Sequence, residues 1–308
     1  MEHNLTLNTT DIERVLPARA VSLFASFTFA SCSLIGTISN LITIIALLKS
    51  KLREQTTTKF VVNLAICDLV LCAVPFPLYA RQYASEQLLY PYQDILLPML
   101  IIRWVFGSSG LDFLIAITVN RYVKICQGRY YDSIFSKRNV WILIAFIWIV
   151  RLVFGLVFLN GGLVYLKATG DHKQFSIFGD HAAISIIFMA QVFIPPPILI
   201  GCSVAMVRKM KNYDEQNNSF GIHTNHESKL VKISIIIVVF YVASVTPNYT
   251  VNIISRLVGS SKIQSIMFQN FHLLCFMLLG VNVIVNPFIY VYMSQDYRKA
   301  FHELFKST

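Results

Sequence analysis

The chain has 308 residues, of which 55% are hydrophobic and only 14% are charged, with 26 Lys and Arg against 16 Asp and Glu. Soluble domains carry about 25% charged residues, so this composition argues against a water-soluble globular protein and favours a single membrane domain. The net charge of +10 would suit nucleic acid only if the basic residues shared one water-exposed face, so their position along the chain decides this point.

Seven apolar stretches follow one another along the chain, and each is long enough for a bilayer-spanning helix, which needs about 20 mostly apolar residues. The charged residues deep inside them are Asp68, Arg103, Asp112 and Arg151. The spaces between the stretches are short and polar, so little room remains for a second, soluble domain. The predicted spans are 22–48, 58–82, 95–123, 139–160, 182–208, 229–256 and 265–292.

The end of the chain predicts a further, shorter helix over 295–306, amphipathic and lying on the membrane surface. Its apolar side consists of Tyr297, Phe301, Leu304 and Phe305. The fold class predicted is therefore an all-α membrane protein, a seven-transmembrane helix bundle with a short amphipathic eighth helix. Its expected parts are an extracellular N-terminus over 1–21, the bundle over 22–292 and a short cytoplasmic tail with the eighth helix over 293–308.

The distribution of Lys and Arg over the loops predicts the orientation. The N-terminal segment and the loops at 81–95, 160–181 and 256–264 hold 7 basic residues, whereas the other three loops and the tail hold 17. The N-terminus is therefore expected outside, without a signal peptide before the first helix, and the C-terminus in the cytoplasm. Acids balance bases outside, so the whole +10 faces the cytoplasm and anionic lipid, not nucleic acid. Asn4 and Asn8 are glycosylation acceptors on the outer side.

Three motifs mark the second, third and seventh spans. Asn-Arg-Tyr at 120–122 closes the third span, where an Arg that snorkels to the membrane edge is the ordinary alternative. Asn-Pro-Phe-Ile-Tyr at 286–290 closes the seventh, where a simple proline kink is the alternative. Asp68 is a lone acid amid apolar residues of the second span, and such residues are functional candidates by default.

Taken in order within seven spans, these motifs resemble the landmarks of the rhodopsin-like, or class A, family of G protein-coupled receptors, over residues 20–306 of the chain. Asn in place of the usual Asp at 120 is shared with a minority of members, among them melatonin receptors and the insect Moody and Trapped-in-endoderm receptors. The stretch 117–130 looks most like the last two. The matching landmarks are Asn40, Leu64, Ala65, Asp68, Asn120, Arg121, Tyr122, Trp148, Pro195, Pro247, Asn286, Pro287 and Tyr290.

The resemblance implies a switch on the cytoplasmic side. Arg121 pairs with the foot of the sixth helix in the resting state, and alignment from Pro247 assigns the partner position to Glu227, for which a solvated loop acid is the alternative. Outward motion of the sixth helix frees Arg121 to meet a heterotrimeric G protein, the partner that the family implies. The residues assigned to this switch are Asn120, Arg121, Tyr122, Glu227 and Tyr290.

One buried polar cluster is expected among the first, second and seventh helices, formed by Asp68, Asn40, Asn282 and Asn286. In the family such a cluster binds sodium. A buried carboxylate without a partner neutralises, so either a sodium ion or a proton is expected at Asp68, and no other metal. Gly110 stands where a hydroxyl often completes the sodium shell, which leaves both alternatives open.

The ligand pocket is predicted around Arg103, which lies about 27 Å outward from Arg121 along the third helix. In amine-binding receptors this position is an Asp, so the reversed sign speaks against a biogenic amine and suits a carboxylate, a phosphate or an acidic lipid. An Arg paired with Asp94 or with backbone carbonyls is the alternative. The other pocket candidates are Gln191, Asn248, Asn252 and His272, and for the two Asn residues the alternative is helix–helix hydrogen bonding.

Asp112 and Arg151 are the remaining charges inside spans, on the third and fourth helices. We expect them to form an ion pair, because either charge alone in a bilayer is costly. The alternative is that one or both face a water-filled cavity.

The chain also departs from the family pattern. No Cys stands at the outer end of the third helix or in the loop 160–181, so the disulfide that tethers this loop in most relatives is not expected. Val245 stands where most relatives carry an aromatic toggle residue on the sixth helix. A divergent chemoreceptor branch is therefore an alternative within the family.

Other classes fit less well. A retinal protein needs a Lys in the seventh span, which has none; the alignment position is Gly280, so no retinal is expected. A seven-helix channel or transporter not coupled to G protein is a further alternative, although no internal repeat of the kind found in transporters is present. The motifs of metal sites, nucleophile elbows and phosphate loops are absent from the sequence, so an enzyme is not expected. The prediction is a receptor of the plasma membrane.

Overall fold

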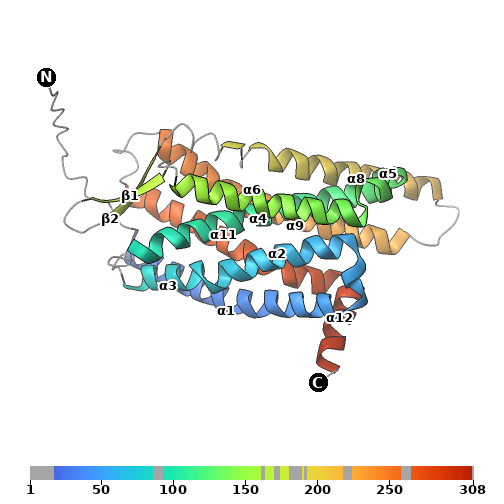
Figure 1. The fold of residues 1–308 in the computed structure, drawn as a ribbon, viewed down its shortest axis with the longest axis horizontal. Coiled ribbons are helices and arrows are strands. Elements are labelled where there is room, and N and C mark those ends of the chain that lie inside the picture. The colour runs from blue at the N-terminus through green and yellow to red at the C-terminus, as the bar shows by residue number, and fades with distance from the viewer. Residues whose placement is uncertain are drawn as a thin grey trace.

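The computed structural model describes residues 17–85, 93–160, 164–169, 174–179, 189–190, 193–217, 224–257 and 265–306. Within these ranges, long helices run side by side along one axis, and a small hairpin lies at one end of the bundle (Figure 1). The long helices are α1 (Arg19–Lys49), α2 (Thr56–Ala73), α4 (Gln93–Cys126), α6 (Lys137–Asn160), α8 (Pro195–Asn217), α9 (Thr224–Leu257) and α11 (Ile266–Met293). The shorter elements are η1 (Lys51–Glu54), α3 (Pro75–Ser85), α5 (Gly128–Ile134), β1 (Val164–Thr169), β2 (Gln174–Gly179) and α12 (Gln295–Lys306).

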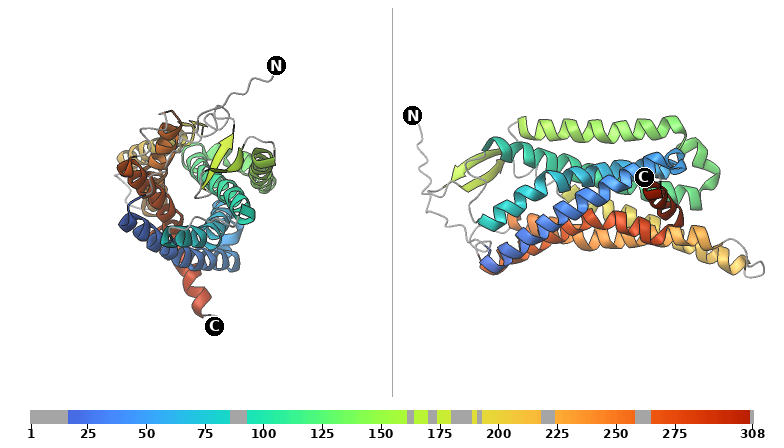
Figure 2. Two further views of the ribbon diagram at one scale, coloured as in Figure 1. Left: turned by 90° about the vertical axis from the view of Figure 1, so that its left-hand side faces the viewer. Right: turned by 90° about the horizontal axis from the view of Figure 1, so that it is seen from below.

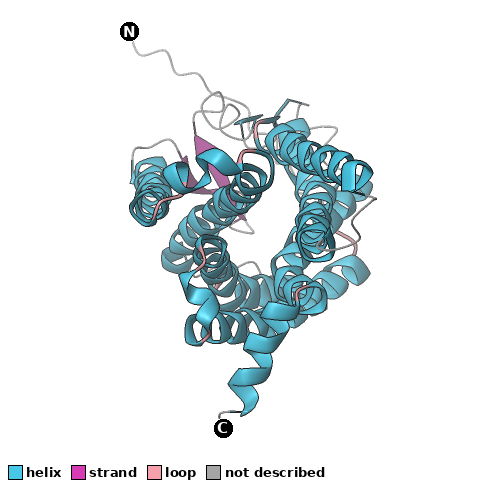
Figure 3. Cartoon of the chain, turned by 90° about the vertical axis from the view of Figure 1, so that its right-hand side faces the viewer, coloured by secondary structure: helices cyan, strands magenta, loops and turns pink. Residues whose placement is uncertain are grey.

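The seven-helix prediction is confirmed. Among the described residues, six helical segments are long and apolar enough to cross a membrane: α1, α2 with α3, α4, α6, α9 and α11. The seventh position belongs to α8, which packs against α4 and α9 and completes the ring seen end-on (Figures 2 and 3). Only 22% of the apolar window of α6 is buried, against 56% for α2 with α3, so α6 is peripheral and its apolar side chains suit contact with acyl chains.

The second predicted span, 58–82, lies within one segment long and apolar enough to cross a membrane, Thr56–Ser85, but that segment consists of two helices, α2 and α3. The structure divides it at Val74, whose N–H donates to the carbonyl of Val70 at 3.0 Å, and α3 begins at Pro75. Proline has no N–H to donate, which is harmless at the first position of a helix. This break aims Phe76 and Tyr79 of α3 into the bundle, where both are buried.

The all-α prediction holds for the bundle, and the structure adds one antiparallel hairpin within the loop 160–181. Strand β1 pairs with β2 from Val164 opposite Gly179 to Thr169 opposite Gln174. Both strands are rich in β-branched and aromatic residues, which favour strands. All six cysteines lie within the described ranges and are free, so backbone hydrogen bonds, rather than a disulfide, order this part of the loop.

Close packing of α1 against α2 and α11 depends on Gly36. A Cβ atom at this position would overlap the Cys72 Sγ and lie 2.8 Å from the Ile284 Cγ2. At the hairpin end of α1, Phe29 centres an aromatic cluster, with ring centroids 5.5 Å from Phe76 and 4.9 Å from Phe276. These contacts hold α1, α3 and α11 together around one end of the bundle.

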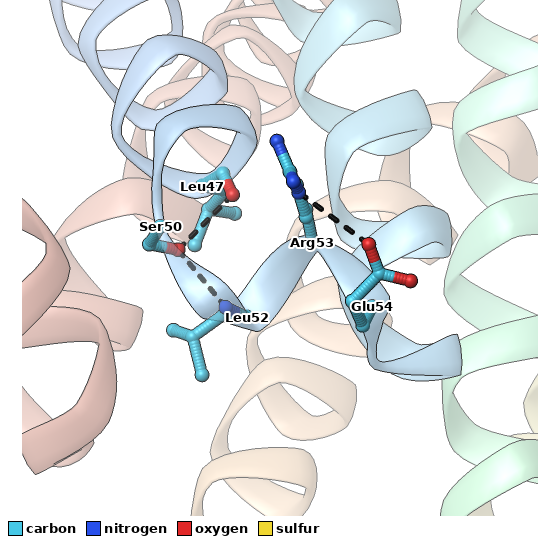
Figure 4. Close-up of polar contacts among 5 residues, drawn as sticks. All are labelled: Leu47, Ser50, Leu52, Arg53 and Glu54. Atoms are coloured by element: carbon cyan, nitrogen blue, oxygen red, sulfur yellow. Dashed lines mark hydrogen bonds and ion pairs between the residues drawn. The ribbon is translucent and has the colours of Figure 1, made fainter.

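A tight turn connects α1 to α2 at the opposite end (Figure 4). The Ser50 hydroxyl donates to the carbonyl of Leu47 at 3.0 Å and accepts from the N–H of Leu52 at 3.2 Å. Arg53 and Glu54 form an exposed ion pair at 3.4 Å, which contributes little to stability because water screens it. The Ser50 side chain therefore fixes the turn locally.

The predicted eighth helix is present as α12, which turns away from the long helices and points outward from the bundle (Figure 1). Its Tyr297 is buried and stacks on Tyr290 of α11, with ring centroids 5.4 Å apart. Burial raises the pKa of the Tyr297 hydroxyl, and the nearby Arg121 guanidinium opposes part of that rise. The last turn of α11, the start of α12 and the inner end of α4 thus meet at one place.

Candidate functional site

A cavity of about 240 Å³ lies inside the bundle, between α2, α3, α4, α6, α9 and α11. Its lining extends along α4 from Leu100 to Leu114 and along α11 from Phe276 to Asn286. At about 1.5 Å per residue, these stretches give a depth of roughly 15 to 21 Å. The cavity therefore reaches about half of a hydrocarbon core roughly 30 Å thick.

Arg103 lines the outer part of this cavity, nearer the hairpin end. Its guanidinium carbon lies 4.7 Å from the Phe276 ring centroid and 5.9 Å from that of Tyr79, within the range of cation–π attraction. No carboxylate of the described side chains pairs with it; the side chain of Asp94, the alternative partner, lies outside the description. The guanidinium is thus held by two aromatic faces and by the Tyr79 hydroxyl, and it faces the cavity.

Asn248 and Asn252 lie on α9 and line the same cavity. The Asn252 Nδ2 donates to the Asn248 Oδ1 at 3.2 Å and to the Asn248 carbonyl at 2.7 Å, so the Asn248 side chain is oriented by its neighbour. Both hydrogen bonds stay within α9, so they are not the bonds between helices that were the alternative for Asn248 and Asn252. The Asn248 Nδ2 is buried and has no hydrogen-bond partner among the described residues.

The two other predicted pocket residues have different outcomes. The cavity lining among the described residues does not include His272. The reason is its position, four residues and therefore about one helical turn before Phe276, which brings it above the outer end of the lining. Gln191 lies outside the described residues, so that prediction stays open.

The middle of the cavity is mostly apolar, with Phe106 and Tyr241 as its aromatic residues. Val245 lines it from α9 and is only 4% exposed, with Leu111 and Leu114 of α4 in the same lining. Gly110 is also there, and a Cβ atom added to it would meet Leu64 at an ordinary 3.5 Å. The lining is continuous from Arg103 to Asp68, with Gly110 and Val245 as small residues in between.

Polar residues form the inner end of the cavity. The Asn286 Nδ2 donates to the Asp68 Oδ2 at 2.9 Å, and both side chains are buried. Asn282 lines the same space. Asn40 departs from the predicted cluster, because its Nδ2 donates to the carbonyls of Gly36 at 3.0 Å and Val283 at 3.5 Å. Asn40 therefore ties α1 to the α11 backbone and forms no bond with Asp68.

Asp112 and Arg151 form the ion pair that the sequence predicts. The Arg151 Nε lies 2.5 Å from the Asp112 Oδ2, and the Nη2 lies 2.7 Å from the Oδ1. This bidentate geometry is the strong form of the contact. It links α4 to α6 beside Trp104, whose ring centroid is 6.0 Å from the guanidinium carbon.

The Asn-Arg-Tyr motif lies at the end of α4 opposite to the hairpin. Asn120 is fully buried, accepts from the Thr57 hydroxyl at 2.7 Å and donates to the Tyr131 hydroxyl at 3.3 Å. It therefore joins α2, α4 and α5, and Thr57 and Tyr131 are partners that the sequence did not reveal. Nothing in their local pattern separates them from other polar residues near a membrane edge.

The remaining residues of the predicted switch are placed only in part. Tyr122 borders a shallow groove between α4 and α8, and Pro287 lies within α11. The Tyr290 hydroxyl is buried and has no hydrogen-bond partner among the described residues. Position 227 falls in α9, but the Glu227 side chain lies outside the description, as do the acceptors Asn4 and Asn8. The Arg121–Glu227 lock therefore stays a prediction.

Comparison with known proteins agrees with this architecture. Residues 39–290 match the family described as 7 transmembrane receptor (rhodopsin family). The chain belongs to this family of rhodopsin-like G protein-coupled receptors, which are multi-pass membrane proteins. Its family is one of receptors rather than of enzymes.

Individual relatives confirm the resemblance to the insect receptors. Protein trapped in endoderm-1 of Drosophila melanogaster is 22% identical over 317 aligned residues, covering 93% of this chain and 78% of that protein. The G-protein coupled receptor moody of Drosophila pseudoobscura pseudoobscura is 25% identical over 197 residues, covering 62% of this chain and 29% of that protein. Melatonin receptors also match. Squid rhodopsin has the same fold, with a TM-score of 0.76 at 22% identity, covering 94% of this chain and 87% of its own.

Proposed function

We propose that this receptor binds an extracellular ligand in the cavity around Arg103 and activates a heterotrimeric G protein at the plasma membrane. The observation that carries the proposal is the continuity of the cavity from Arg103 to the Asp68–Asn286 hydrogen bond. A ligand in the outer half can thereby influence a polar contact between α2 and α11. Since Tyr290 lies one turn beyond Asn286 on α11, that contact is coupled to the α11–α12 junction.

The orientation belongs to the same proposal. Segment 1–21 is extracellular, with glycans at Asn4 and Asn8, and segment 293–308 is cytoplasmic. The support is the basic bias of the loops between α1 and α2, α4 and α6, and α8 and α9. The basic surface on that side then faces anionic lipid and the G protein.

The ligand carries an acidic group and is not a biogenic amine. The support is the cationic Arg103 in the outer part of the cavity, where an ammonium group would be repelled. A carboxylate or phosphate accepts two parallel hydrogen bonds from a guanidinium. At the inner end, Asp68 holds a sodium ion or a proton, because a buried carboxylate needs one of the two. Retinal is not proposed, since Gly280 offers no amine for a Schiff base.

Activation is a shift between two states of the bundle. In the resting state Arg121 pairs with Glu227, and in the active state α9 moves outward and Arg121 meets the G protein. A ligand drives this shift only as far as its affinities for the two states differ. Breaking the pair without a ligand therefore raises basal signalling.

Cells that carry reporters for several G protein classes test the proposal. Glu227→Ala is expected to raise basal signalling in at least one class, and the added change Arg121→Ala is expected to abolish that signal. Asp132→Ala, an exposed acid in α5, is the matched control and leaves the basal level unchanged. Surface receptor without a signal in any class, together with a current through the membrane, would instead favour a channel or transporter.

A further inference from the structure

We propose that the ligand is an amphiphilic acid of medium length, whose anionic head binds Arg103, Tyr79 and Asn248 and whose apolar chain extends inward past Val245. This inference rests on the proposed function, because it takes the cavity as the ligand site. It adds the shape of the ligand, two further residues that bind its head, Tyr79 and Asn248, and one residue, Val245, whose small side chain leaves room for the chain.

The head site is defined by donors that the described residues leave unsatisfied. The Asn248 Nδ2 is buried, lines the cavity and has no hydrogen-bond partner among the described residues. The Tyr79 hydroxyl is also buried beside the Arg103 guanidinium; a guanidinium can only donate, so the hydroxyl proton is left without an acceptor among the described residues. Tyr249, next to Asn248, lies within electrostatic range of Arg103, which places this part of α9 across the cavity from Arg103. A buried donor without an acceptor is destabilising. The three donors of Arg103, Tyr79 and Asn248 therefore suit an anion, whose oxygens accept several hydrogen bonds.

The chain site is the apolar lane between α4 and α9. Leu111 and Leu114 line it from α4, and Ile237 and Val245 line it from α9. Asp68, Asn282 and Asn286 come instead from α2 and α11, while Tyr241 adds an aromatic ring with a hydroxyl to the α9 side, between Ile237 and Val245. An apolar chain can therefore extend along α4 and α9 without covering the Asp68 carboxylate.

The length of the lane sets the length of the chain. Arg103 and Leu114 are eleven residues apart on α4, about 16 Å at 1.5 Å per residue. A zig-zag of carbon bonds of about 1.5 Å advances about 1.25 Å per carbon, which allows about ten carbons once the head is seated. The lane therefore fits a chain of about eight to ten carbons.

Val245 is the residue that keeps the lane open. It is 4% exposed and stands in the lining with its small side chain. Phe at this position fills the lane and shortens it from the inner end. Gly107 offers a second site for the same change, since a Cβ atom there has no other heavy atom within 4 Å, so Gly107→Leu narrows the lane without a steric clash in the bundle.

The test measures the binding of defined probes to the purified receptor by thermal stabilisation, independently of any G protein. The probes are butanoate, octanoate, decanoate and hexadecanoate, with octyl phosphate to compare the two kinds of anionic head and octanol as the uncharged control. We expect octanoate or decanoate, or octyl phosphate of the same length, to bind at least tenfold more tightly than butanoate, hexadecanoate and octanol. Tighter binding of octanoate than of octyl phosphate would identify the head group as a carboxylate, and the reverse order would identify it as a phosphate.

Four variants sharpen the test. Arg103→Gln is expected to abolish the preference for the acid over octanol, and Tyr79→Phe to weaken the binding of the acid alone. Val245→Phe and Gly107→Leu are expected to shift the preferred chain toward butanoate. Val239→Phe makes the same change on α9 at a side chain that is 62% exposed, and is expected to leave the preference unchanged.

Equal binding of octanol and octanoate, or no dependence on chain length in the wild type, would overturn the inference. An unchanged length preference in both Val245→Phe and Gly107→Leu would overturn the role of the lane. Acid binding without a response in any G protein reporter would instead contradict the proposed function and leave the inference standing. A G protein response to neutral compounds alone would contradict the inference about an acidic ligand and leave the proposed function standing.

Discussion

The ion pair between Asp112 and Arg151 allows the sharpest prediction about stability. At 2.5 and 2.7 Å, the bidentate contact brings the two charge centres to about 4 Å, and two unit charges at that distance attract by about 4 kcal/mol at an effective dielectric constant of about 20. The side chains are 20% and 22% exposed, so screening by solvent is limited. Removing one partner of such a pair costs about 3–5 kcal/mol.

The two single changes are not expected to cost the same. Arg151→Met leaves a carboxylate that can take up a proton and become neutral. Asp112→Asn leaves a guanidinium that stays charged inside the bundle. Asp112→Asn is therefore the more damaging of the two, with a loss near the upper end of that range, and Arg151→Met lies near or below the lower end.

The measurement is the thermal unfolding temperature of the purified receptor, with surface expression as a second readout. The double change Asp112→Asn with Arg151→Met should recover most of the stability lost in Asp112→Asn, because it leaves no buried charge. The charge-swapped pair Asp112→Arg with Arg151→Asp should recover part of it. A double change no more stable than Asp112→Asn alone would refute the reasoning, since the loss would then come from packing and not from an unpaired charge.

Three further predictions address other parts of the bundle. Gly36→Ala should destabilise the receptor by about 1–3 kcal/mol, because its new methyl group overlaps Cys72. Gly110→Ala, whose nearest contact would be at 3.5 Å, should change the unfolding temperature little, and equal effects of the two changes would contradict the packing account. Thr57→Val should cost about 1–3 kcal/mol in the same assay, since it leaves the fully buried Asn120 Oδ1 without its donor, and a neutral outcome would argue against that bond. If sodium binds at Asp68, the wild-type receptor should unfold at a higher temperature in sodium chloride than in choline chloride. Asp68→Asn should remove this difference and the control Asp132→Asn should keep it. A wild type without the difference would indicate that Asp68 holds a proton instead.

Long apolar stretches and the cost of buried charge made much of the fold predictable. The spans follow from the length of their apolar runs, and the Asp112–Arg151 pair follows from the cost of either charge alone. The direction of Tyr79 after the break in the second span was not predictable. Pro75 and Pro77 indicate that the helix is interrupted, but not how α3 is rotated, and that rotation is what turns Tyr79 inward. A sequence shows which residues are polar, whereas their partners depend on helix rotation.

The polar contacts illustrate the same limit. Asn40 was expected beside Asp68, and instead it donates to backbone carbonyls of α1 and α11. Carbonyls exist at every residue, so no sequence pattern distinguishes them as partners. Thr57 and Tyr131 became visible only when α2, α4 and α5 were brought together around Asn120.

The central claim is that this receptor activates a G protein through Arg121, and it can be measured without a known ligand. The measurement is nucleotide exchange on purified heterotrimers by Glu227→Ala receptor in lipid nanodiscs, for each major G protein class. The account predicts exchange above that of empty discs for at least one class, and its loss in the double variant Glu227→Ala with Arg121→Ala. Folded receptor that promotes no exchange in any class, or exchange that persists without Arg121, would contradict it.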